Sequence, residues 1–136
     1  MKRARPAWKW TAAACSVAIL LTSFPAGAAD WPTWRHDAGR SAASPEQLPE
    51  ALNLEWRRDN RPLVPAWPED PRVHFAAGYE PIVAGGTMFV ASSQNDSVTA
   101  LDTQTGDERW RFYAGGPVRF APVADDGRVY FGADDG

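Results

Sequence analysis

The sequence predicts an all-β protein, a β-propeller of four-stranded antiparallel blades. The first observation is a hairpin at 97–113, in which apolar side chains recur on both sides of a glycine-bearing turn. The second is an internal repeat: the segment that begins at Pro81 recurs from Pro122 without a gap, at an offset of 41 (122 − 81). Each copy has the pattern strand, glycine turn, strand, and the hairpin follows the first copy. A four-stranded unit of this length is typical of a propeller blade.

The two copies agree in residue type at positions that suit strands and the turn between them. A single sheet of this kind has two apolar faces and cannot bury both, so we expect each blade to pack between neighbours. The matching positions are Pro81 with Pro122, Gly86 with Gly127, Met88 with Val129, Phe89 with Tyr130 and Val90 with Phe131.

Residues 1–29 are expected to be a signal peptide. A basic start is followed by the apolar run Thr11–Phe24 and by Ala26–Ala28, a small-residue cleavage site. A membrane helix, the alternative, needs about 20 apolar residues, and this run is shorter, so we expect no membrane span. A lipoprotein would use Cys15, but Cys15 precedes most of the apolar run. We therefore expect an exported protein, periplasmic or secreted.

Cleavage would also change the charge. The four basic residues of the signal are lost, so the 14 Lys and Arg fall to 10 against 17 Asp and Glu, a net charge of −7. The cysteine is lost with them, which leaves no disulfide and no thiolate chemistry. An acidic domain without a basic patch is a poor match for nucleic acid or for anionic membrane surfaces.

Residues 30–50 are expected to be a lead-in segment that precedes the repeats. Its two tryptophans, Trp31 and Trp34, are expected to cover an apolar seam; stacking on a ligand is the alternative. His36 lies beside Asp37, but adjacent residues on a loop rarely face each other. We therefore expect a structural role for His36, and the same for His74, which lies in a predicted strand.

Residues 51–59 are expected to form a closing outer strand. Trp56 aligns with Trp110 of the hairpin, although their offset is 54 (110 − 56) and no turn motif precedes Trp56. We interpret this strand as the outer strand of the last blade, supplied by the N-terminal part to close the ring and remove exposed sheet edges.

Residues 60–72 contain four prolines, which cannot donate to a β ladder, so this segment is expected to be a loop. It is either a rim segment that presents Trp67 or a stiff spacer over a seam. Blade 1 is then expected at 73–113 and the start of blade 2 at 114–136. The acidic turns at 125–127 and 134–136 are interpreted as turn chemistry, because they lack the calcium-loop spacing.

The hairpin resembles the tryptophan docking motif of the PQQ-like repeat. That pattern is A-x-D-x-x-T-G-x-x-x-W, and the matching residues are Ala100, Asp102, Thr105, Gly106 and Trp110, with Trp56 as a second docking indole. The resemblance implies an eight-bladed propeller of the quinoprotein or outer-membrane-assembly lipoprotein type. In that family the indole stacks on a turn of the adjacent blade. About one and a half blades are visible here, and eight would need roughly 330 residues, so we interpret the sequence as an N-terminal fragment.

The resemblance leaves two functions open. One is a PQQ-dependent dehydrogenase that oxidises an alcohol or sugar with PQQ and Ca²⁺. For its cofactor site the candidates are Glu80 and Arg119, but Glu80 directly adjoins Pro81 and no cysteine follows Tyr113. The other, which we favour, is a non-catalytic binding or assembly scaffold that holds a protein or small molecule at the propeller face. On that interpretation no catalytic or metal-binding residue is expected here, and PQQ would need further blades.

Overall fold

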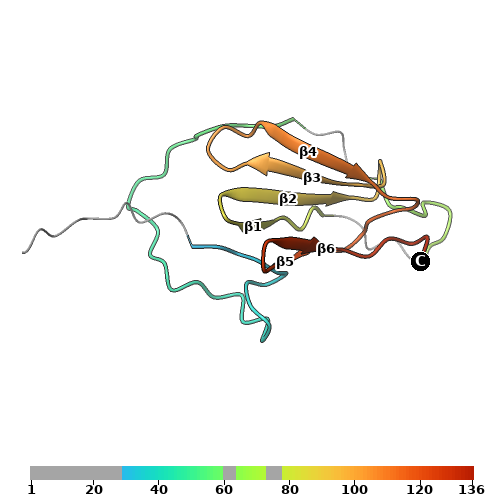
Figure 1. Ribbon diagram of the computed structural model, residues 1–136, viewed down its shortest axis with the longest axis horizontal. Coiled ribbons are helices and arrows are strands. Elements are labelled where there is room, and N and C mark those ends of the chain that lie inside the picture. The colour runs from blue at the N-terminus through green and yellow to red at the C-terminus, as the bar shows by residue number, and fades with distance from the viewer. Residues whose placement is uncertain (1–28, 60–63, 73–77) are drawn as a thin grey trace, which may run out of the picture.

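The computed structural model describes residues 29–59, 64–72 and 78–136; residues 1–28 of the predicted signal peptide and His74 lie outside them. The described residues form six strands in two antiparallel sheets (Figure 1). The larger sheet has the order β1-β2-β3-β4, and β5 pairs with β6 in the smaller one. The bounds are β1 Ile82–Ala84, β2 Thr87–Ser92, β3 Ser97–Asp102, β4 Glu108–Tyr113, β5 Val123–Asp125 and β6 Arg128–Tyr130. A four-stranded antiparallel sheet of this kind is consistent with a propeller blade.

The internal repeat is visible in the strands. β5 and β6 begin at the offset that the alignment predicts from β1 and β2 (123 − 82 and 128 − 87, both 41). The turns between them also match, because Gly86 and Gly127 both have a left-handed backbone, with φ of 69° and 71°. Glycine adopts this conformation without the steric cost that a Cβ would bring.

The core lies between the two sheets. Strand β2 alternates, so that Phe89 and Ala91 are buried while Met88 and Val90 face the opposite side. Val118, from the connection between the sheets, is also buried in this core. The second sheet closes the core with the partly buried side chains of Ala124 and Val129, and Phe131, which follows β6, adds to them. β5 packs beside β1, as Figure 1 shows.

The outer strand β4 is less well covered. Trp110 and Phe112 extend the core face, but they are 44% and 53% exposed. Phe112 meets Phe131 at a ring-centroid distance of 5.6 Å, and Trp110 meets Phe89 at 5.8 Å. The second sheet has two strands, so it covers less of the core face than a four-stranded sheet would.

The lead-in segment joins the first strands of both sheets. Trp31 exchanges two backbone hydrogen bonds with Val83 of β1, at 2.7 and 2.9 Å. The carbonyl of Pro32 accepts from the amide of Ala124 in β5 at 2.8 Å. From there the chain passes around the end of the larger sheet to the β4 side, drawn in teal and green in Figure 1.

Residues 51–59 are predicted to be the closing outer strand of the last blade. They form no β ladder with the described residues, so the ring closure stays a prediction. A strand needs a neighbouring backbone edge for its hydrogen bonds. The segment instead contacts the larger sheet through the side chains of Trp56 and Arg58.

The described part of the proline-rich segment, residues 64–72, contacts the second repeat. At its centre Trp67 is 49% exposed, and its indole N–H donates to Asp134 at 3.0 Å. This contact joins residues that are 67 positions apart in the chain.

Candidate functional site

The turn between β3 and β4 is built by residues of the tryptophan docking motif. Oδ1 of Asp102 accepts from the amides of Gln104 and Thr105, at 2.8 and 3.0 Å. Gly106 has a φ of 74°, a left-handed conformation that glycine adopts without the steric cost of a Cβ. The Thr103 hydroxyl donates to the carbonyl of Gly86 at 3.1 Å, which links this turn to the one between β1 and β2.

Arg109 adds an ion pair to this turn. Its guanidinium donates to Oδ2 of Asp102 at 2.7 Å and also contacts the hydroxyl of Thr87. The Arg109 hydrogen bond, followed by those from the turn amides, holds the pKa of Asp102 below its usual value. The carboxylate therefore stays ionised and keeps its turn contacts.

Trp56 lies on this turn. Its Nε1 donates to the carbonyl of Thr103 at 2.8 Å. A Cβ built on Gly106 would meet the Cδ2 and Cε3 atoms of the Trp56 ring at 2.7 Å. The indole therefore packs directly on the glycine, and its N–H satisfies a turn carbonyl.

Trp110 has a different environment. Its ring contacts Phe89 but is nearly half exposed. It lies opposite Ala100 in the β3–β4 ladder, on the face that meets the second sheet. Among the described residues the Asp102–Gly106 turn carries the docking motif, and Trp56 occupies it. Docking of Trp110 on a further turn therefore remains a proposal.

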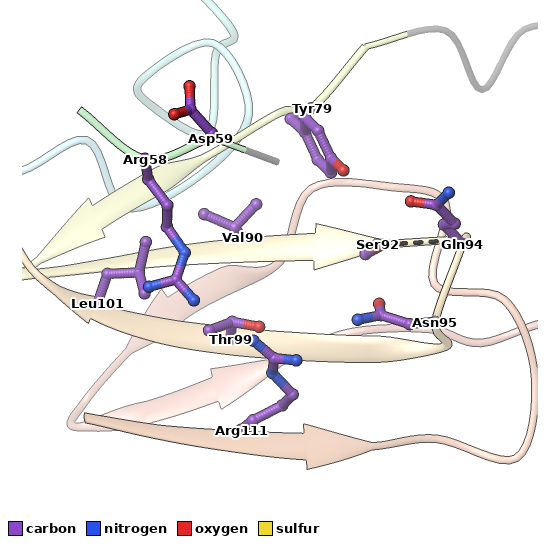
Figure 2. A pocket seen from close by; sticks show the side chains of 10 residues that line it. All are labelled: Arg58, Asp59, Tyr79, Val90, Ser92, Gln94, Asn95, Thr99, Leu101 and Arg111. Carbon is purple, nitrogen blue, oxygen red and sulfur yellow. Dashed lines mark hydrogen bonds between the residues drawn. The ribbon is translucent and has the colours of Figure 1, made fainter. Parts of the chain in front are cut away.

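A cavity lies between residues 58–59 and the face of β2–β4 opposite the core. Its volume is about 420 Å³. Figure 2 shows Arg58 on one side and Arg111 on the other, with Thr99 between them on β3. Most of the lining side chains are polar; the full set is Arg58, Asp59, Tyr79, Val90, Ser92, Gln94, Asn95, Thr99, Leu101 and Arg111.

One carboxylate links the two arginines of the cavity. Oε2 of Glu108 accepts from Arg58 at 3.0 Å and from Arg111 at 2.6 Å. Arg58 also donates to the carbonyl of Gly106 at 3.3 Å, so this network and the Trp56 contact hold the same turn. The pKa of Arg111 is raised, chiefly by its hydrogen bond with Tyr113. Glu108 therefore holds the guanidinium groups of Arg58 and Arg111 beside the cavity.

Glu80 and Arg119, the two cofactor candidates, make separate contacts. Oε2 of Glu80 accepts from the amide of Ala121 at 3.3 Å; these residues are 41 apart and occupy equivalent repeat positions. Arg119 donates twice to Asp134, at 2.7 and 2.8 Å. This bidentate bond lowers the pKa of Asp134, with a smaller contribution from Trp67. Glu80 and Arg119 therefore each bind another residue of the scaffold.

The described residues contain no group of three or more His, Cys, Asp or Glu side chains arranged to hold a metal ion. Within the same residues no helix has the length and apolar character needed to cross a membrane. Arg58, Glu108 and Arg111 form a group that is not among the predicted site residues. No local pattern could have indicated it, because Arg58 and Glu108 are 50 positions apart in the chain.

Two antiparallel sheets built from an internal repeat, with an indole docked on a glycine turn, are consistent with the blades of a propeller-type repeat protein. The family model described as "Outer membrane protein assembly factor BamB" matches residues 32–136. The chain belongs to this family of PQQ-like repeat proteins. No curated protein matches the chain.

Proposed function

We propose that this protein is a non-catalytic binding scaffold, exported and built from PQQ-like repeats. In this proposal residues 51–59 form the outer strand of a ring-closing blade, and Trp110 docks on the turn of the next one. The family description names an assembly factor, which supports a role in holding other proteins.

One observation carries the proposal: the two residues that could bind a cofactor are engaged in the scaffold itself. Glu80 binds the amide of Ala121 and so joins the starts of the two repeats. Arg119 makes a bidentate pair with Asp134, and the two side chains are only 17% and 20% exposed. Freeing either group for a cofactor would break a charge-assisted bond. These residues therefore fit a structural role better than a catalytic one.

The cavity beside Arg58 and Arg111 supports a binding role. Its polar lining, which includes Ser92, Gln94 and Asn95, suits a polar group presented by a partner. A fold of this kind confers no activity without a reactive site, so the surface chemistry decides the function.

Calorimetric titration of the purified chain with PQQ, in the presence and absence of Ca²⁺, tests the proposal. We expect no saturable binding and no reduction of an electron-accepting dye with alcohols or sugars. Saturable binding that is lost in Arg119→Gln but kept in Arg57→Gln, an exposed control, would favour the dehydrogenase instead. Amino-terminal sequencing of the protein recovered outside the cytoplasm should begin near residue 29 or 30 if the export prediction is right.

A further inference from the structure

The lead-in loop at 33–42 carries an exposed group of one aromatic and two basic side chains. The guanidinium carbon of Arg35 lies 5.6 Å from the ring centroid of Trp34, and that of Arg40 lies 5.2 Å from it. The indole is 40% exposed, and both arginines are exposed. We name these three residues the arginine–tryptophan cluster. A guanidinium stacked on an indole has a restricted orientation and still presents its N–H groups to a ligand.

The two arginines of the cluster have no carboxylate partner among the described residues. Six other arginines each bind a carboxylate within 3.1 Å: Arg57, Arg58, Arg72, Arg109, Arg111 and Arg119. Arg128 also lacks a carboxylate partner among the described residues. Unlike Arg35 and Arg40, however, it is not stacked on a described aromatic ring. The cluster therefore carries two uncompensated positive charges on one aromatic ring, in a sequence with more acidic than basic residues.

Asp37, the acidic residue nearest to both arginines in the sequence, does not form an ion pair with either of them. Asp37 accepts from the amide of Ser41 at 3.0 Å and from the Ser41 hydroxyl. The Ser41 hydrogen bonds are the main reason that the pKa of Asp37 is lowered. Asp37 thus closes the loop, and neither arginine pairs with it.

The backbone holds the arginines in an unusual conformation. Four of the six described non-glycine residues with positive φ lie in this loop, and they include Arg35 at 61° and Arg40 at 55°. Such a conformation is uncommon for side chains of this size and persists where surrounding contacts enforce it. The amide of Ala42 donates to the carbonyl of Arg35 at 2.9 Å, which fixes the loop across its base.

The loop is also anchored to the two sheets. Trp31, which pairs with β1, meets the ring of His36 edge-on at a centroid distance of 4.9 Å. Pro32 binds β5. The cluster therefore follows directly after the segment that joins the first strands of both sheets, and it is held by that segment.

We propose that the arginine–tryptophan cluster docks an acidic segment of a protein partner. The guanidinium groups of Arg35 and Arg40 bind carboxylates of that segment, and Trp34 provides the apolar contact. Neither the cavity beside Arg58 nor the one at Trp67–Arg72 includes the cluster, so a small ligand would have little to enclose it. Exposed tryptophan and arginine are the residue types that dominate protein interfaces. The inference rests on the proposed binding role and adds the chemistry of the partner.

Calorimetric titration of the full chain with a hexaglutamate peptide tests this proposal, with hexaglutamine and inorganic phosphate at matched ionic strength as comparisons. We expect saturable binding of hexaglutamate that weakens with added salt. Arg35→Gln and Arg40→Gln should each weaken it about tenfold, because each removes one charge-assisted contact. Arg57→Gln, which removes the same charge from an exposed ion pair, should change it less than about twofold.

Reversing the charge of both arginines gives a second test, which applies even if Arg35→Gln or Arg40→Gln unfolds the protein. The double variant Arg35→Glu with Arg40→Glu should lose hexaglutamate binding and gain binding to a hexalysine peptide, with an unchanged circular dichroism spectrum. The proposal is overturned if hexaglutamate does not bind, if Arg57→Gln weakens binding as much as Arg40→Gln, or if phosphate binds the cluster as tightly as the peptide. Binding of PQQ is measured separately, so a failure here leaves the scaffold proposal standing.

Discussion

The indole of Trp56 lies on Gly106 with no space for a side chain between them. The Cβ of any other residue at position 106 would come within 2.7 Å of the indole ring. These residues are separated by 50 positions (106 − 56), so the contact fixes the segment around Trp56 against the larger sheet. The hydrogen bond from Nε1 to the Thr103 carbonyl sets the orientation of the ring.

Two substitutions of Trp56 should distinguish the contribution of its packing to stability from that of its hydrogen bond. Trp56→Ala removes both and should lower the free energy of unfolding by about 2 kcal/mol, less than for a fully buried tryptophan because the ring is half-buried. Trp56→Phe keeps most of the packing and should cost about 1 kcal/mol. Urea unfolding of the two variants checks the order. Equal effects would mean that the ring contributes little by packing.

Glu108 should stabilise the protein through both arginines of the cavity. Glu108→Gln leaves Arg58 and Arg111 without their shared carboxylate, and we expect a loss of about 1 kcal/mol in the free energy of unfolding. Asp59→Asn is a matched control, because the side chains of Arg57 and Asp59 are 74% and 79% exposed in their pair. That control should have almost no effect. A larger loss in Asp59→Asn than in Glu108→Gln would contradict the network.

The Arg119–Asp134 pair predicts a pH dependence. Arg119 lowers the pKa of Asp134 in the folded protein, so the unfolded state takes up the proton first as the pH falls. The stability from this pair is fully present above the ordinary pKa of 3.8 and is lost as the pH falls through the lowered value. Asp134→Asn should therefore be less stable than the unmodified protein at pH 7, and the difference should shrink below pH 3.8.

Urea unfolding at several pH values measures this difference, with Asp126→Asn as an exposed control. A difference between Asp134→Asn and the unmodified protein that is the same at every pH would contradict the ion pair.

Local patterns predicted the strands well, and contacts distant in sequence were harder to predict. The alternation at 97–113 and the turn residues Asp102 and Gly106 are local signals, and the structure follows them. The repeat also placed β5 and β6, because strands so similar in sequence adopt the same register. The match of Trp56 with Trp110 indicated a docking indole, but it could not say which turn Trp56 contacts.

Other features have no signal in a single sequence. The left-handed backbone at Arg35 and Arg40 is imposed by surrounding contacts, since these residue types do not favour it. The ion pair of Arg58 with Glu108 depends on how a segment without regular strands lies across a sheet. Such contacts form only after the chain has folded, so spacing along the sequence does not reveal them.

The most direct test of this account is a comparison of Gly106→Ala with Gly86→Ala. Both glycines have a left-handed backbone in turns of the same sheet, with φ of 74° and 69°. The new methyl group at position 86 would meet nothing closer than the Thr103 hydroxyl at 3.9 Å, whereas at position 106 it would overlap the Trp56 ring. Both variants therefore share the cost of placing alanine in a left-handed backbone. Only Gly106→Ala adds a clash with the Trp56 ring.

We predict that Gly106→Ala lowers the free energy of unfolding by about 1–3 kcal/mol more than Gly86→Ala does. In a Trp56→Ala background this excess should fall below about 0.5 kcal/mol, because the coupling between the two positions is removed. An excess that is absent in the unmodified background, or that persists without the indole, would contradict the docking of Trp56 on this turn.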